Sequence, residues 1–210
     1  MLEIVNNFIN GEFAEPYNKE YLDIYEPATG SVYGKVADSS IHDINKAVES
    51  ATDAFPYWSG LSMVERADYL KKIAAGIKNR SNILAKYESR DTGKPITLAS
   101  KVDIPRAIEN FNFFANFSEN FYFESNIESE VSINSVSKQA LGVVGCISPW
   151  NLPLYLFTWK IAPALIVGNT VLAKPSEITP LTASKLAAIC SDIGLPRGVL
   201  NIVNGSGQVA

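Results

Sequence analysis

The chain has 210 residues, of which 47% are hydrophobic and 19% are charged. This is the composition of an ordinary globular protein, and it excludes intrinsic disorder and collagen-like repeats. Lys and Arg number 18 against 22 Asp and Glu, which leaves a net charge of −4. No basic excess is available to neutralise phosphates, so nucleic acid is not expected as a partner.

The cysteine count and the hydropathy profile point to a cytoplasmic, soluble protein. Cys146 and Cys190 do not make a disulfide framework, which fits a reducing compartment. The N-terminal residues lack the basic start and apolar run of a signal peptide, and no stretch reaches the ~18 apolar residues of a membrane span. With His42 as the single histidine, expected on the surface, no metal site is predicted. Each cysteine is expected to be a buried structural thiol rather than a nucleophile.

The first part of the chain predicts short strands. Asn10-Gly11 lies between apolar residues and supplies the positive φ angles of a tight turn, which predicts a hairpin over 7–13. Further strands are expected at 21–25 and 31–36, with a turn between them at 27–30.

Helices are predicted next. Apolar residues from Ile44 to Phe55 recur on one helical face, and Ser40 with Asp43 resembles a capping box before it. Ser62 with Glu65 forms a better capping box, which opens a second helix. A third helix is expected over 82–90, and Thr92-Gly93-Lys94-Pro95 is expected to end it. A fourth is expected over 96–121, interrupted near Pro105, with its phenylalanines packed on both sides of the helix.

The segment 124–140 alternates polar and apolar residues and predicts a strand-rich arm extending from the body. A plain surface hairpin is the alternative. An exposed strand edge is also a place where a second subunit can pair.

The final third predicts strands alternating with helices. Buried strands are expected at 143–147, 170–173 and 199–203. The helices between them are expected at 153–167 and after Thr179, which is predicted to be the cap of the second one, with Pro180 at its first position. This β-α-β-α-β order folds as parallel strands with right-handed crossovers, so the fold class is α/β.

Three polar segments follow these strands, at 148–151, 174–177 and 204–207. Ligands of parallel sheets bind at the carboxyl ends of the strands, so the three segments are expected to meet at one ligand-binding edge.

Individual residues at this edge have two interpretations. Lys174 and Glu177 are able to bind the hydroxyls of an adenosine ribose or to form a surface ion pair, and their place at the sheet edge favours the ligand. Gly205-x-Gly207 is a fragment of a dinucleotide-type turn, and most such pairs are simple turns. Asn151 is suited to steady an oxyanion, to cap a helix, or both.

From residue 142 onwards the sequence contains G-V-V-G-C-I-S-P-W-N-L-P-L, then W-K-I-A-P-A-L-x-x-G-N-T-V-L-A-K-P-S-E-I-T-P, and then G-L-P-R-G-V-L-N-I-V-N-G-S-G. With these motifs the chain resembles the NAD(P)-dependent aldehyde dehydrogenase superfamily. F-I-N-G-E-F, P-A-T-G, A-F-P-Y-W and D-T-G-K-P resemble the N-terminal portion of the same family.

The resemblance implies a role for each matching residue. Asn151 corresponds to the asparagine that stabilises the oxyanion. Lys174, Ser176 and Glu177 correspond to contacts with the adenosine ribose, and the glutamate implies NAD as the cofactor. The remaining cofactor-binding positions form the cleft wall and the pyrophosphate region, namely Ile147, Ser148, Pro149, Trp150 and Gly207.

V-D-I-P-R-A-I-E-N-F and S-P-W-N-L-P-L-Y-L-F-T-W-K are similar to the branch acting on 2-aminomuconate or 2-hydroxymuconate semialdehydes. There, Arg106 would hold a substrate carboxylate, and Leu152 would contact the substrate. A surface arginine on a helix is the alternative for Arg106.

The family's nucleophilic cysteine and general-base glutamate come from motifs downstream of anything in this sequence. The resemblance therefore implies the N-terminal portion of an enzyme, with an incomplete Rossmann-like sheet. The expected parts are the N-terminal coenzyme-domain region 1–123, an oligomerisation arm at 124–140 and the Rossmann-like region 141–210.

Three hypotheses follow. The first is a truncated product that is inactive alone and belongs to an NAD-dependent oxidation of an aldehyde substrate. The second is a non-catalytic nucleotide-binding or oligomerisation module, which pairs as a dimer or tetramer through 124–140. The third is a subunit completed by a separately encoded carboxyl half.

Overall fold

The computed structural model describes residues 2–117, 121, 124–129 and 131–209. The strands are β1 (Glu3–Val5), β2 (Asn7–Ile9), β3 (Glu12–Ala14), β4 (Tyr21–Glu26), β5 (Ser31–Ala37), β6 (Glu124–Glu128), β7 (Ile133–Ser137), β8 (Val143–Ile147), β9 (Thr170–Lys174) and β10 (Leu200–Ile202). The helices are α1 (Ile41–Gly60), α2 (Met63–Asn79), α3 (Ser81–Thr92), α4 (Ile96–Leu98), the π-turn η1 (Ala99–Asp103), α5 (Ile104–Phe117), α6 (Pro153–Ile166), α7 (Leu181–Asp192) and the 3₁₀ turn η3 (Gly207–Val209).

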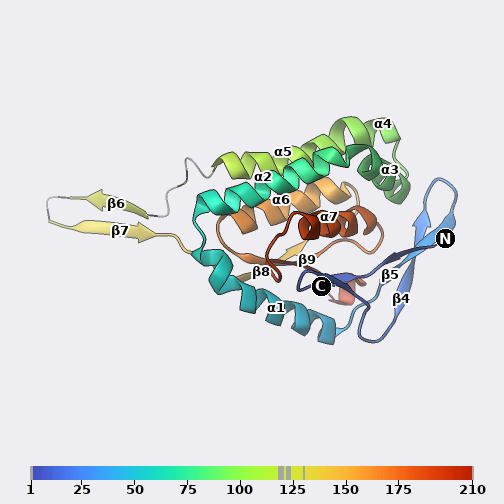
Figure 1. Ribbon diagram of the computed structural model, residues 1–210, viewed down its shortest axis with the longest axis horizontal. Coiled ribbons are helices and arrows are strands. Elements are labelled where there is room, and N and C mark those ends of the chain that lie inside the picture. The colour runs from blue at the N-terminus through green and yellow to red at the C-terminus, as the bar shows by residue number, and fades with distance from the viewer. Residues whose placement is uncertain (1, 118–120, 122–123, 130, 210) are drawn as a thin grey trace.

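A five-stranded sheet in the order β3-β2-β10-β9-β8 forms the centre of the body. β8, β9 and β10 are parallel, which confirms the predicted β-α-β-α-β unit. Helix α1 lies on one face of this sheet, and α6 and α7 lie on the other, with α2 and α5 outside them (Figure 1). The carboxyl ends of the three parallel strands therefore lie along one edge.

The N-terminal hairpin is part of this sheet. Asn10 and Gly11 have φ angles of 54° and 78°, so the predicted tight turn is confirmed. β2 pairs with β10 in antiparallel orientation, with Phe8 opposite Ile202. A strand from the start of the chain thereby borders the strand that precedes the third polar segment.

The capping boxes predicted from sequence begin two of the helices. Ser62 Oγ accepts from Glu65 N at 3.2 Å, and Glu65 Oε2 accepts from Ser62 N at 2.8 Å. A second such box at Ser40 and Asp43 begins α1. These reciprocal bonds satisfy helix N–H groups that have no partner within the helix.

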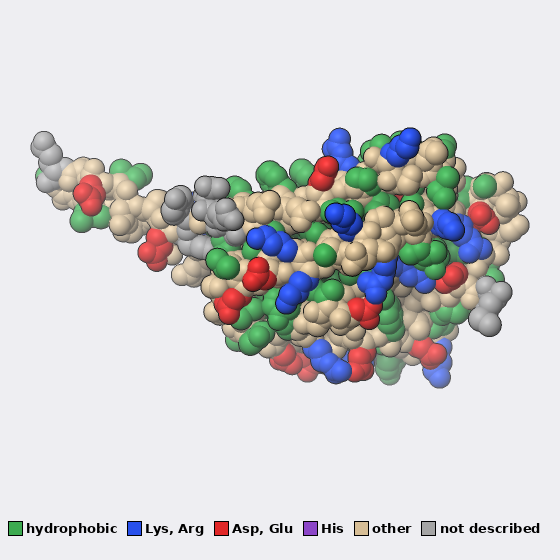
Figure 2. Space-filling model, turned by 45° about the horizontal axis from the view of Figure 1, so that its top comes forward, with side chains coloured by type: hydrophobic (Ala, Val, Ile, Leu, Met, Phe, Trp, Pro, Cys, Tyr) green, Lys and Arg blue, Asp and Glu red, His purple; other side chains and the backbone are tan. Residues whose placement is uncertain are grey.

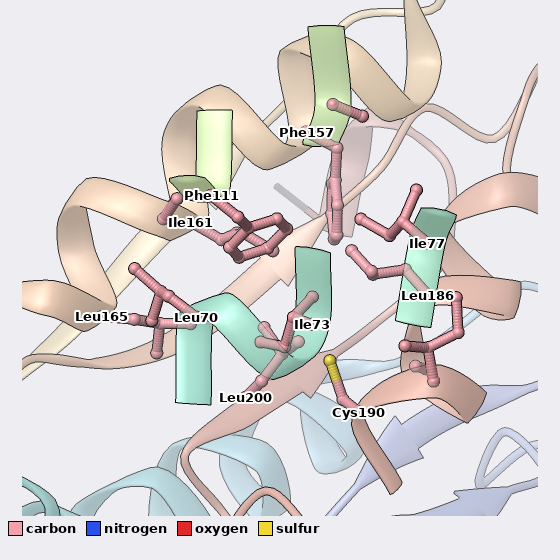
Figure 3. Packing of buried hydrophobic residues seen from close by; sticks show 14 of the residues in the cluster. Leu70, Ile73, Ile77, Phe111, Phe157, Ile161, Leu165, Leu186, Cys190 and Leu200 are labelled. Carbon is pink, nitrogen blue, oxygen red and sulfur yellow. The ribbon is translucent and has the colours of Figure 1, made fainter. Parts of the chain in front are cut away.

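The largest hydrophobic core lies between the sheet and the four helices on the α6 side. Figure 3 shows side chains from α2, α5, α6, α7 and β10 converging there. Its labelled members are Leu70, Ile73, Ile77, Phe111, Phe157, Ile161, Leu165, Leu186, Cys190 and Leu200. This core fixes the end of α6 that follows the first polar segment.

The helix predicted over 96–121 is interrupted near Pro105, as expected. The π-turn η1 lies directly before this residue, and proline has no N–H to donate to the carbonyl four residues earlier. The helix α5 extends to Phe117, residues 118–120 lie outside the described part of the chain, and Phe121 is not in a helix.

The phenylalanines of α5 do not pack on both sides of the helix, as the sequence predicted. Phe111 is fully buried, whereas Phe113 is 58% exposed and Phe117 is 40% exposed. The reason is that α5 packs on α2 and α6 along one face only. The other face carries aromatic side chains on the surface.

Two further predictions in the last third need correction. Strand β8 is not fully buried: Ile147 is 58% exposed, because β8 is the edge strand of its sheet. Thr179 does not cap α7, since its hydroxyl donates to the carbonyl of Trp150 at 3.2 Å. Asp91 instead accepts from the first helical N–H, that of Leu181, at 2.8 Å.

The arm projects away from the body as a two-stranded antiparallel sheet, β6-β7 (Figure 1). Every residue of both strands is exposed. A separate three-stranded sheet, β1-β5-β4, lies at the opposite end of the molecule. None of the helices in the described ranges combines the length and the hydropathy required to cross a bilayer.

Candidate coenzyme site at the sheet edge

The three polar segments lie at the carboxyl ends of β8, β9 and β10, as the sequence predicted. Ser148 N donates to the carbonyl of Lys174 at 3.0 Å, which continues the pairing of β8 and β9 into the loops. Thr179 Oγ1 then ties the second loop to Trp150. The first two segments therefore form one connected surface.

An apolar cleft of about 400 Å³ lies beside this edge, between the start of α1 and the three strands. Its walls include Ile41, Ile44, Cys146, Ile147, Leu172, Lys174, Val203 and Gln208. A cleft with apolar walls and a few polar groups at its rim is the usual form of a small-molecule site. Two of the predicted cofactor residues, Ile147 and Lys174, are in its wall.

Lys174 and Glu177 lie together at this rim. Lys174 Nζ is 3.5 Å from Glu177 Oε2, and their side chains are 11% and 34% exposed. Ser176, half-buried between them, accepts a hydrogen bond from Ile178 N through its hydroxyl at 3.3 Å. The pair offers one donor and one partly exposed acceptor toward the solvent, which is the chemistry that a ribose with two hydroxyls requires.

Asn151 is exposed, and its side-chain amide makes no hydrogen bond to any described residue. Its alternative role as a helix cap is not observed, since Leu152 is the cap residue of α6 and makes no side-chain capping bond. Pro149 and Trp150 are exposed beside it. The amide of Asn151 is therefore available to a ligand.

The third segment is anchored to the start of the chain. Asn204 N donates to Asn7 Oδ1 at 2.8 Å, and Asn204 Nδ2 donates to the carbonyl of Asn6 at 3.0 Å. Ser206 N donates to Asp38 Oδ1 at 3.1 Å. Gly207, which begins η3, is exposed, and the sequence alone gave no sign of these distant anchors.

Both thiols are buried. Burial raises the pKa of Cys190 to about 12. Burial also raises the pKa of Cys146, although the nearby Lys160 opposes the shift. Because the nucleophile in cysteine chemistry is the thiolate, neither residue is suited to that role at neutral pH.

Arg106 lies apart from the cleft. It lines a smaller hollow of about 160 Å³ between α5 and α6, together with Asn110, Phe113, Tyr155 and Trp159. Its guanidinium is 5.6 Å from the ring centre of Tyr155 and is exposed. Leu152, half-buried, precedes α6, and the helix links the hollow to the loop that carries Asn151.

Two buried carboxylates and a partly buried lysine behind the loop were not selected from the sequence. Lys94 Nζ is 2.6 Å from Asp103 Oδ2 and 4.0 Å from Glu88 Oε1. Burial raises the pKa of Glu88 to about 7, and hydrogen bonding from Thr182 opposes the shift. In the sequence, Lys94 is part of the turn Thr92-Gly93-Lys94-Pro95. This turn indicates the end of a helix but not the carboxylates that Lys94 contacts.

No group of three or more His, Cys, Asp and Glu side chains suited to a metal ion occurs within the described ranges. Lys and Arg side chains on the face in Figure 2 are dispersed among acidic and apolar ones rather than gathered in one patch.

Three parallel strands with polar loops at their carboxyl ends, beside an apolar cleft, are the arrangement at which α/β proteins with a Rossmann-like fold bind their ligands. The model of the aldehyde dehydrogenase family matches residues 13–210. The chain belongs to the aldehyde dehydrogenase family.

Individual relatives agree with this assignment. The chain is 46% identical to 2-aminomuconic semialdehyde dehydrogenase of Mus musculus, over 98% of this chain and 42% of that protein. It is 40% identical to 2-hydroxymuconic semialdehyde dehydrogenase of Pseudomonas sp. strain CF600, over 97% of this chain and 43% of that protein. The structure of PnpE from Pseudomonas sp. WBC-3 in complex with nicotinamide adenine dinucleotide superposes with a TM-score of 0.94 at 37% identity, covering 98% of this chain and 42% of PnpE. The chain thus spans less than half the length of these relatives.

Proposed function

We propose that this chain supplies the coenzyme-binding part of an NAD-dependent aldehyde dehydrogenase that oxidises a carboxylated semialdehyde to the acid. The observation that carries the proposal is the placement of Asn151 and of the Lys174–Glu177 pair at the carboxyl ends of two neighbouring parallel strands. The relatives named for 2-aminomuconic and 2-hydroxymuconic semialdehydes support the substrate class.

The residues at the edge fit the adenosine half of NAD. The carboxylate of Glu177 is able to accept both ribose hydroxyls, and its charge would repel the 2′-phosphate of NADP. Lys174 adds a donor at the same rim. When bound, NAD supplies the acceptor for the hydride that leaves the substrate.

Asn151 would act on the aldehyde itself. An amide N–H aimed at the carbonyl oxygen stabilises the negative charge that develops there when a nucleophile attacks. The nucleophilic thiol is not expected from Cys146 or Cys190, because both are buried with raised pKa values. Residues 1–210 alone are therefore expected to bind but not to turn over substrate.

Arg106 would select the carboxylated substrate. Its exposed guanidinium lies 5.6 Å from the ring centre of Tyr155 and offers a charge for the carboxylate. The rings of Tyr155 and Trp159, which line the same hollow, offer flat surfaces for a conjugated chain. This role follows from the hollow between α5 and α6, and the alternative is a surface arginine with no substrate contact.

The test uses the gene product at the full length of its reading frame. We expect it to oxidise 2-hydroxymuconic semialdehyde with NAD. In Glu177→Gln, kcat/KM with NADP is expected to rise relative to kcat/KM with NAD. Arg106→Met is expected to raise KM for the semialdehyde but not for propanal. Lys185→Met, which loses a half-exposed ion pair with Glu3, is the matched control.

Absence of NAD-dependent oxidation of any semialdehyde would contradict the proposal. If Arg106→Met raises KM equally for the semialdehyde and for propanal, Arg106 does not select the carboxylated substrate. The proposed coenzyme site would not be affected by that result.

The exposed arm supports a second candidate function, that of an oligomerisation module. All ten residues of β6 and β7 are exposed, and their free edges are suited to pairing with another subunit. A dimer or tetramer by light scattering supports this role, and a monomer at every concentration tested contradicts it.

A further inference from the structure

The loop between β8 and α6 is held on its backbone by side chains from distant parts of the chain. Lys94 Nζ donates to the carbonyl of Asn151 at 3.3 Å, and Thr179 Oγ1 donates to the carbonyl of Trp150 at 3.2 Å. At the start of α6, Leu154 N donates to Glu88 Oε1 at 3.4 Å. Each of these contacts fixes the main chain and leaves the side chain of Asn151 unbound.

Lys94 is itself fixed by its surroundings. Its ammonium lies between two carboxylates, those of Asp103 and Glu88, at 2.6 Å and 4.0 Å. The side chains of Lys94, Asp103 and Glu88 are 11%, 1% and 0% exposed. Ser89 Oγ also donates to the carbonyl of Lys94 at 2.7 Å. This partly buried ammonium has little freedom to move, since leaving its partners would leave two buried carboxylates without a cation.

The position of the Asn151 amide depends on this support. The residue is exposed, and its amide has no partner among the described residues, so the main chain at 150–152 sets the region that the amide can reach. Of the three backbone contacts above, the one from Lys94 is the contact made to Asn151 itself.

We propose that Lys94 is a positioning residue for the oxidation: held by Asp103 and Glu88, it fixes the carbonyl of Asn151 and thereby aims the Asn151 amide at the substrate oxygen. This inference rests on the proposed function of Asn151. The D-T-G-K-P turn, which the sequence predicted as the end of a helix, thereby also helps to position a group that acts on the substrate.

The test compares Lys94→Met/Asp103→Asn with the unmodified gene product at the full length of its reading frame. The double change removes one charge of each sign, so the net charge is kept. We expect kcat to fall roughly 10- to 100-fold, because a small misplacement of a stabilising donor costs that much. KM for NAD is expected to change less than about twofold, since the adenosine contacts at Lys174 and Glu177 are separate.

A mutant cycle with Asn151→Ala separates positioning from general structural support. If Lys94 acts through Asn151, the double change lowers kcat little further in the Asn151→Ala background. A full additional loss in that background overturns the proposal. Lys185→Met/Glu3→Gln removes a half-exposed ion pair between α7 and β1 and serves as the control, with kcat expected to stay unchanged.

Hydrogen exchange gives a readout that does not depend on activity. Peptides covering 148–156 are expected to exchange faster in Lys94→Met/Asp103→Asn than in the control variant, and equal exchange overturns the proposal. If the double variant melts more than about 4 °C lower, Lys94→Gln/Asp103→Asn, which keeps two polar amides in the buried site, replaces it. A gene product that oxidises no aldehyde disproves the proposed function separately, and exchange then decides whether Lys94 holds the loop.

Discussion

The body and the arm of this chain contain strands of the same length in opposite surroundings. β9 has five residues, four of them buried, between two parallel neighbours of the central sheet. β6 and β7 also have five residues each, and all ten are exposed. β6 and β7 pair with each other along their whole length, whereas β9 pairs on both edges. Strand pairing is therefore present in both regions, and burial is found only in the body.

The difference teaches that packing, rather than strand pairing, supplies the stability of this fold. An isolated two-stranded hairpin is marginal in water, because its backbone bonds replace bonds to solvent at little net gain. The body gains stability by burying apolar surface on both faces of its sheet. The arm requires a partner to bury Ile127, Ile133 and Val136, which are now 65%, 67% and 48% exposed.

The largest expected effect is in the body. Phe111→Ala removes a fully buried ring from the core between α2, α5 and α6, and is expected to lower the free energy of unfolding by about 3–5 kcal/mol. Phe113→Ala, on the same helix but 58% exposed, is the matched control and is expected to change it by less than about 0.5 kcal/mol. Urea unfolding measures both, and equal losses would contradict the one-sided packing of α5.

A close approach of two helices in the body gives the next effect. A methyl group on Gly76 of α2 would lie 2.4 Å from Ile189 Cγ2 of α7, so Gly76→Ala is expected to cost about 1–3 kcal/mol. Combining it with Ile189→Ala should cost less than the sum of the two single changes, measured by urea unfolding. Gly60→Ala, with no atom within 4 Å of the added methyl, is the control.

A pH dependence of stability is expected from the buried carboxylates. Burial raises the pKa of Glu88 from 4.5 to about 7, so the folded chain retains a proton that the unfolded chain releases. This contribution is complete below about pH 4.5 and is lost as the pH rises to about 7. Glu88→Gln cannot titrate, and its stability relative to the unmodified chain should therefore rise by on the order of 2–3 kcal/mol from pH 5 to pH 8.

Thermal unfolding at the two pH values measures this difference. Glu128→Gln on the arm, where the side chain is exposed, controls for the change of charge. If the Glu88 variant and the control respond alike to pH, the raised pKa is not the source of the dependence.

The smallest effect on unfolding is expected in the arm. Ile133→Ser/Val136→Ser changes exposed residues only, so the free energy of unfolding of the body should change by less than about 0.5 kcal/mol. The same variant is expected to weaken self-association, seen as a lower mass by light scattering. A large loss of body stability with unchanged mass would show that the arm packs on its own body.

Much of the candidate site could be predicted from local patterns. The β-α-β-α-β order placed Asn151, Glu177 and Gly207 at one edge, because right-handed crossovers leave parallel strands with their ends together. The burial of Cys190 also followed from its place on an apolar helix face. The support behind the loop could not be predicted, since Lys94 and Asn151 are 57 residues apart and the lysine resembled a solvated turn residue.

The sequence by itself determined the features that depend on neighbouring residues. Asn10-Gly11 forms its turn because glycine and asparagine tolerate positive φ, and Ser62 with Glu65 begins α2 because both bonds close within one turn. The tertiary structure decided where distant polar groups meet. Asp91 accepts a hydrogen bond from Leu181 N at the start of α7, 90 residues later in the sequence. The hairpin at 7–13 pairs with β10 near the other end of the chain. Such contacts depend on how whole elements bury their apolar faces, and only the folded chain brings their polar partners within hydrogen-bonding distance.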